Sequence, residues 1–205
     1  MQDGVARSRG GRGYARTNNP ARARLERAVS ELQSAVHWLA LASRSAATAR
    51  VGEPGEELVV SEDVYDGTLR YFERGLAPIR VFARYADLSG DVARAIASTR
   101  AARTRVVWVE IPSNPLLKLV DVPTVAGALA SRASSRGERP LLVVDSTFAT
   151  PWAQRPLELG ADVVLTHVAI AGSVLKVPAA LMRLPAGIEH SDDLVDDVSR
   201  ALDEA

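Results

Sequence analysis

Lys118 and Lys176 are the only side-chain amines in this 205-residue sequence. The other 23 of its 25 basic residues are arginines, which stay protonated and can act neither as a general base nor as an imine-forming amine. The sequence contains no cysteine, which excludes disulfides, zinc–thiolate sites and cysteine nucleophiles. The three histidines are too far apart along the chain for a local metal motif: His37, His167 and His190. Any lysine-dependent covalent chemistry therefore has two candidate residues, Lys118 and Lys176.

Polar residues follow apolar runs at three places, Glu110–Pro115, Asp145–Phe148 and Leu165–His167. Ligands of parallel α/β sheets bind outside the carboxyl ends of the strands, so these segments are candidate site positions. Asp145 closes the run Leu141–Val144, where an acid is costly unless it is paired or exposed. Taken alone, Asp145 is more typical of a helix cap or a loop anchor than of a binding site, since Asp is a common turn former.

Short apolar runs alternate with helical stretches, which predicts an α/β fold with a mostly parallel sheet and helices on both faces. Clear helical patterns cover Asp91–Thr99 and Val122–Arg136. The apolar runs expected to form strands are Trp38–Ala42, Glu57–Val60, Ile79–Ala83, Arg105–Ile111, Leu141–Asp145 and Asp162–Leu165.

Helices are also expected near both ends of the sequence. Asn19-Pro20 is typical of a helix start, and the apolar residues from Leu25 to Val36 recur at helical spacing. Ser191 would cap a last helix with acidic residues in its first turn.

The charge distribution is uneven, with six arginines in residues 1–24 and seven acids in residues 189–205. The basic arm is typical of a flexible terminus, with a nucleic-acid tail or a transit peptide as alternatives. A net charge of +0 and a pI near 6.9 argue against nucleic-acid binding. No apolar run approaches the ~18 residues of a membrane span, and no apolar signal peptide is visible, so we expect a cytoplasmic protein.

Motifs along nearly the whole chain, in order, resemble the pyridoxal-phosphate-dependent enzymes of Cys/Met metabolism, the relatives of cystathionine γ-lyase, β-lyase and γ-synthase. The resemblance implies the large domain of the aminotransferase-like fold (fold type I). It implies transsulfuration chemistry, the elimination at C–S bonds of sulfur amino acids. The matching segments are Gly13–Pro20, Asp63–Thr68, Glu110–Pro115, Val144–Pro151, Gln154–Leu157, Gly160–Asp162 and Leu181–Glu189.

The same resemblance implies roles for individual residues. Asp145 would pair with the pyridinium nitrogen of the cofactor, which keeps the ring an electron sink. Tyr65 would stack on one ring face, Thr147 would support the other, and Asn114 would bind the phenolic oxygen. Tyr14 and Arg16 would bind the phosphate across a dimer interface, and Ser43 would belong to the phosphate loop. Arg183 would bind the substrate carboxylate through its two-pronged guanidinium.

The pattern breaks at the family's Schiff-base lysine, which belongs to a Ser-x-Thr-Lys segment. Aligned without gaps, its position falls on Ile170. A better alignment places an internal deletion after Leu165, which removes the lysine, the adjacent strand and most of the small domain. That strand separates the first and sixth strands of the family sheet, so its loss would leave the first strand, here Trp38–Ala42, unpaired or force it into a new pairing. In the phosphate loop, Arg44 replaces a glycine, which weakens the expected cradle.

These observations predict a truncated family member without a catalytic lysine and therefore impaired or inactive. We expect three parts: a basic arm over residues 1–24, a partial cofactor-binding large domain over 25–165, and a small-domain remnant over 166–205. Two alternatives stay open. The chain could be a non-catalytic subunit that joins full-length relatives, as a homo- or hetero-oligomer through its N-terminal arm, or it could be a decayed gene product.

Overall fold

The computed structural model describes residues 20–41, 44–48, 52–98, 103–130 and 139–167. The chain divides into two compact units, Met1–Ser43 and Arg44–Ala205. Helix α2 (Pro20–Leu32) belongs to the first unit and begins at the proline that the sequence marks as a helix start. The second unit contains the sheet and the candidate site.

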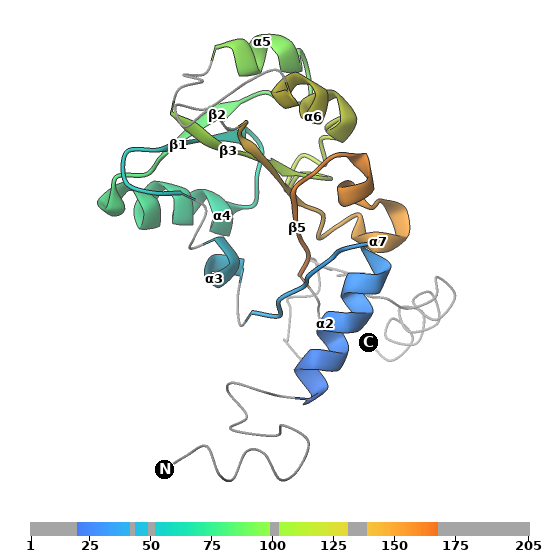
Figure 1. The fold of residues 1–205 in the computed structure, drawn as a ribbon. Helices are drawn as coiled ribbons and strands as arrows, with labels where there is room; N and C mark the ends of the chain where they lie inside the picture. The colour runs from blue at the N-terminus through green and yellow to red at the C-terminus, as the bar shows by residue number, and fades with distance from the viewer. Residues whose placement is uncertain (1–19, 42–43, 49–51, 99–102, 131–138, 168–205) are drawn as a thin grey trace, which may run out of the picture. The chain divides into compact units, whose positions relative to one another are not determined.

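The sheet of the second unit has five parallel strands in the order β2-β1-β3-β4-β5, which confirms the predicted α/β fold (Figure 1). The strands cover β1 Glu57–Ser61, β2 Phe82–Ala86, β3 Thr104–Glu110, β4 Leu141–Asp145 and β5 Val163–Leu165. The central strands β1, β3 and β4 are almost entirely buried, as their continuous apolar sequences predict.

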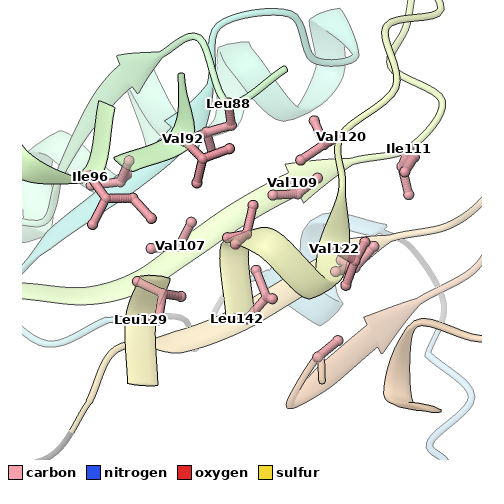
Figure 2. Close-up of a cluster of buried hydrophobic side chains, with 14 residues drawn as sticks. Leu88, Val92, Ile96, Val107, Val109, Ile111, Val120, Val122, Leu129 and Leu142 are labelled. Carbon is pink, nitrogen blue, oxygen red and sulfur yellow. The ribbon is translucent and has the colours of Figure 1, made fainter. Parts of the chain in front are cut away.

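Helices cover both faces of this sheet (Figure 1). On one face, α5 (Val92–Ala97) and α6 (Val122–Ala130) pack on Val107, Val109 and Leu142, with Leu129 fully buried (Figure 2). The other face holds the segment that contains α4 (Asp66–Tyr71), the π-helical turn η1 (Phe72–Leu76) and the 3₁₀ turn η2 (Ala77–Ile79). There Phe72 meets Trp108 edge-to-face, with ring centroids 5.2 Å apart.

Local sequence signals start the helices of the first face. Asp91 is the N-cap of α5 and accepts a hydrogen bond from the Arg94 N–H at 2.9 Å. Asp121 precedes α6 and accepts from the Thr124 hydroxyl at 2.8 Å. The short elements α3 (Arg44–Thr48), α7 (Thr150–Ala153) and the 3₁₀ turn η3 (Pro156–Leu159) complete the described structure.

Three sequence expectations are wrong in detail. Trp38–Leu41 forms no strand; the Ala40 N–H donates instead to the Glu26 carboxylate of α2 at 3.0 Å. Strand β2 begins at Phe82 rather than Ile79, because Pro78 and Ile79 belong to the 3₁₀ turn η2, which Arg80 ends in the left-handed region, at φ 62°. Helix α2 stops at Leu32, so Val36, 88% exposed, lies outside its apolar face.

Two glycines on neighbouring elements allow a paired test of this packing. Gly160 has φ +99°, and a Cβ there would lie 2.8 Å from the Ala126 Cβ of α6. Gly160→Ala should therefore destabilise the fold by about 1–3 kcal/mol. Gly127, inside α6, has open space around it, so Gly127→Ala should stabilise the fold by roughly 0.5–1 kcal/mol. Urea unfolding of both variants checks the prediction, and equal effects would contradict it.

Candidate functional site

Two carboxylates close adjacent strands at the carboxyl edge of the sheet. Glu110 ends β3 and Asp145 ends β4, the register pairs them directly, and both are buried, at 4% and 0% exposure. Their side chains alternate with Val109 and Val144, which pack under α5 and α6, so both acids point to the α4 face. Burial of a carboxylate requires hydrogen-bond donors, and each acid has them.

Asp145 is held by the loop that follows it. Its Oδ1 accepts the Thr147 N–H at 3.1 Å and the Thr147 hydroxyl at 2.5 Å. The Thr147 oxygen in turn accepts the N–H of His167, just beyond β5, at 3.1 Å. The Ser146 N–H donates to the Leu165 carbonyl at 2.8 Å. The carboxylate is thus oriented by both its own loop and the neighbouring strand end.

Glu110 is held from the direction of β1. Its Oε2 accepts the backbone N–H of Tyr65 at 2.9 Å, which positions the residue that precedes α4. The Tyr65 ring lies against Gly67, where a Cβ would come within 2.4 Å of the ring. Glycine at this position therefore lets the aromatic ring lie close to the backbone at the start of α4.

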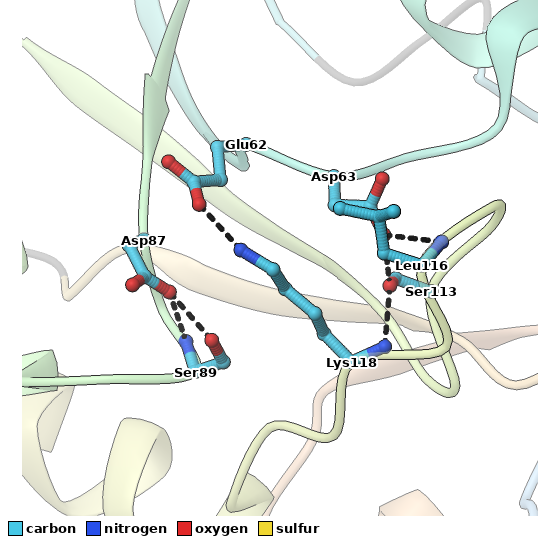
Figure 3. A network of polar contacts seen from close by, with 7 residues as sticks. All are labelled: Glu62, Asp63, Asp87, Ser89, Ser113, Leu116 and Lys118. Carbon is cyan, nitrogen blue, oxygen red and sulfur yellow. Dashed lines mark hydrogen bonds and ion pairs between the residues drawn. The ribbon is translucent and has the colours of Figure 1, made fainter.

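The loop after β3 carries Asn114 at the same edge. Its neighbour Ser113 is 1% exposed and hydrogen-bonds through its hydroxyl to Asp63, which follows β1 (Figure 3). The Asp63 carboxylate also accepts the Leu116 N–H at 3.0 Å. The motifs Asp63–Thr68 and Glu110–Pro115, far apart in sequence, are therefore joined by two hydrogen bonds, one between Tyr65 and Glu110 and one between Asp63 and Ser113.

Lys118 lies in a hollow beside the ends of β1, β2 and β3, whose walls include Glu62, Asp63 and Asp87. Its Nζ is 2.6 Å from Glu62 Oε1 (Figure 3). This hydrogen bond, with the negative charges of Glu62, Asp87 and Asp63, raises the pKa of the Lys118 ammonium. A raised pKa means that less of the neutral amine is present at any given pH, so Lys118 is a poor nucleophile.

The structure places four of the predicted site residues, Tyr65, Asn114, Asp145 and Thr147, at one edge of the sheet, around the ends of β1, β3 and β4. The reasoning from sequence missed Glu110 and Asp63 as the groups that hold this edge together; both stood in quoted motifs. The other predicted site residues lie outside the described residues: Tyr14, Arg16, Ser43 and Arg183. The position of the missing lysine, Ile170, and the second lysine, Lys176, also lie outside them.

Within the part of the chain that the structure describes, no helix is long and apolar enough to cross a membrane. In the same residues, no group of three or more His, Cys, Asp or Glu is arranged to hold a metal ion. The polar edge, the parallel sheet and the helices on both faces define an α/β domain of the kind that binds small ligands outside the carboxyl ends of its strands.

Comparison with known sequences shows to which family this α/β domain belongs. The pattern of the Cys/Met metabolism PLP-dependent enzymes matches residues 1–170, and the chain belongs to this family. Cystathionine gamma-synthase of Mycobacterium leprae is 41% identical over 169 residues, which cover 80% of this chain and 41% of that protein. Cystathionine beta-lyase of Coxiella burnetii is 42% identical over 163 residues, which cover 76% and 39% of the two chains.

Solved structures agree in fold. The structure of metB from Corynebacterium glutamicum matches with a TM-score of 0.66 at 33% identity, covering 77% of this chain and 40% of that chain. Apo CalE6, a methionine gamma lyase from Micromonospora echinospora, matches with a TM-score of 0.65 at 38% identity, covering 75% and 40%. The chain thus spans about two fifths of the length of the relatives it matches.

The Lys118 ion pair makes a testable prediction about amine reactivity. Glu62→Gln removes the main group that raises the pKa of Lys118, so that pKa should fall and labelling of Lys118 by an aldehyde with cyanoborohydride should be faster near pH 8. Mass spectrometry of the Lys118 peptide across a pH series measures this. Glu57→Gln, which removes an acid paired with Arg84 at 3.2 Å, is the matched control and should leave the labelling curve unchanged.

Proposed function

We propose that this chain is a member of the Cys/Met metabolism family that keeps a binding edge for the ring of pyridoxal phosphate but cannot carry out the family's covalent turnover. The ancestral chemistry on this reading is C–S bond elimination on sulfur amino acids. The observation that carries the proposal is the lysine count: neither the ungapped alignment, which places Ile170 there, nor the alignment with a deletion after Leu165 gives a lysine at the Schiff-base position, and the sequence has only Lys118 and Lys176.

The residues at the edge have the chemistry that the ring requires. The Asp145 carboxylate, buried and oriented by Thr147, suits a protonated ring nitrogen. The Tyr65 ring, seated on Gly67, suits stacking, and the Asn114 amide suits a phenolic oxygen. When bound, pyridoxal phosphate supplies an electron-accepting ring for carbanion chemistry on amino acids. Tyr14, Arg16, Ser43 and Arg183 keep the phosphate and substrate roles that the family resemblance implies.

Lys118 is a weak substitute for the missing lysine. It is the only lysine in the described residues, and its ammonium is paired with Glu62 in the hollow beside β1, β2 and β3. Asp145 ends β4, on the far side of β3 from that hollow. A general base must reach its proton directly or through one water, and it must be neutral when it does so. Lys118 is disfavoured by its position and by its raised pKa.

Two ligands test this proposal together. The full chain is mixed with pyridoxal phosphate, or with the analogue whose aldehyde is replaced by methyl and which binds only non-covalently. We expect the analogue to bind, and borohydride reduction of the pyridoxal phosphate sample to give no stoichiometric adduct on a single lysine. Asp145→Asn should weaken the analogue by about tenfold, because a neutral amide stabilises a protonated ring nitrogen less well. Asp91→Asn, which removes an acid but preserves an N-cap, is the control.

Each half of the experiment can fail separately. A stoichiometric adduct mapped to Lys118 or Lys176 would overturn the loss of covalent chemistry. Failure of both ligands to bind the folded chain would overturn the retained binding edge.

Exposed leucines favour a second candidate, a non-catalytic subunit that joins full-length relatives. Leu116, Leu117 and Leu119, in the loop after β3, are 65%, 60% and 67% exposed, and apolar residues gathered in this way are typical of surfaces that a partner covers.

Co-expression tests the subunit candidate. An affinity-tagged copy of the chain, expressed with a full-length cystathionine gamma-synthase, should recover that enzyme in a stable complex. Leu117→Ser with Leu119→Ser should reduce the recovery severalfold because it removes apolar contact area. Val36→Ser, at an exposed valine in the other compact unit, is the control. Equal recovery with a tagged unrelated protein would contradict the candidate.

A further inference from the structure

The two loops that present Tyr65 and Asn114 are joined by a reciprocal pair of carboxylates. One loop follows β1 and the other follows β3. Asp63, on the first loop, accepts hydrogen bonds from the second; Glu110, at the start of the second, accepts one from the first. Each loop therefore supplies the acid that the other loop's donors need.

Asp63 organises the loop that carries Asn114. Its Oδ2 accepts both the Ser113 hydroxyl and the Leu116 N–H, the latter at 3.0 Å. The Ser113 oxygen then accepts the Lys118 N–H at 2.8 Å (Figure 3). The Ser113 N–H donates to the Lys118 carbonyl at 3.0 Å. The segment 113–118 is thus closed on itself around Ser113 and tied to the β1 loop through one carboxylate.

Glu110 completes the connection from the buried side. It is 4% exposed, and its Oε2 accepts the Tyr65 N–H at 2.9 Å. Charge-assisted hydrogen bonds of this kind are stronger than neutral ones, and burial removes the competition of water. Tyr65 and Asn114 are consequently held in one relative position by groups that do not themselves need to touch a ligand.

We propose that Asp63 and Glu110 are positioning residues that set the Tyr65 ring and the Asn114 amide for the cofactor ring before it binds. This rests on the proposed function, since it assigns a role at the same binding edge. Preset loops avoid the ordering cost that a flexible site pays on binding, and binding groups misplaced by as little as 1 Å lose much of their effect.

Asp63 is the better residue to test, because it is only partly buried and its loss should not remove a core group. Asp63→Ala deletes the acceptor of Ser113 and Leu116. Asp63→Asn keeps one oxygen acceptor in the same place and is the rescue variant. Glu62→Ala, at the preceding residue, removes a carboxylate that accepts a hydrogen bond from the side-chain Nζ of Lys118, and serves as the matched control.

Two measurements test separately whether Asp63 joins the two loops and whether this connection strengthens binding of the cofactor ring. Amide hydrogen exchange of segment 113–118, followed at Leu116 and Lys118, should be at least about tenfold faster in Asp63→Ala, and close to wild type in Asp63→Asn and Glu62→Ala. Affinity for the methyl analogue of pyridoxal phosphate should fall by about tenfold in Asp63→Ala and change little in the other two.

Unchanged exchange in Asp63→Ala would overturn the connection between the loops. Faster exchange with unchanged affinity for the analogue would overturn the positioning role while leaving the proposed binding edge intact. If the wild-type chain does not bind the analogue, the proposed function fails and the positioning role fails with it; the exchange data then report the loop connection alone.

Discussion

Burial of two carboxylates at the ends of adjacent strands is the constraint on which the rest of this structure depends. Glu110 and Asp145 are removed from water beside each other, and a buried acid is tolerated only with donors around it. The surrounding loops supply them: the Tyr65 N–H for Glu110, and the N–H and hydroxyl of Thr147 for Asp145. The loops that follow β1 and β4 therefore adopt conformations that supply these hydrogen-bond donors.

The parallel arrangement of the strands brings the two acids and the loops around them together at one site. Because all strands run in one direction, their carboxyl ends meet at one edge, and segments 45 residues apart in sequence become neighbours there. The hydrophobic clusters on the two faces fix the register, since a shift of one residue would move Trp108 and Asp145 to the wrong faces. The apolar core and the polar edge are therefore parts of one arrangement.

Arg139 and Lys118 are both held as cations by neighbouring carboxylates. The Arg139 guanidinium donates two hydrogen bonds to the Asp162 carboxylate, at 2.8 and 2.6 Å, and the same carboxylate accepts the Leu142 N–H, which holds the start of β4 beside β5. Lys118 is also held as a charge, by Glu62. Within the described residues, both side chains thus act as structural cations.

Reasoning from the sequence predicted the α/β class, the bounds of β1, β3 and β4 to within a residue, and the family, because continuous apolar runs and ordered motifs are local signals. Through the family resemblance it also named Tyr65, Asn114, Asp145 and Thr147 as cofactor-binding candidates, and the fold brings them to one edge of the sheet. It predicted that the first expected strand, Trp38–Ala42, would lose its neighbouring strand, but it could not show whether that run would find a new partner; in the structure Trp38–Leu41 forms no strand. Nor could it show that Asp63 and Glu110 join two loops, because hydrogen bonds between residues about 50 positions apart exist only once the sheet has brought its strand ends together.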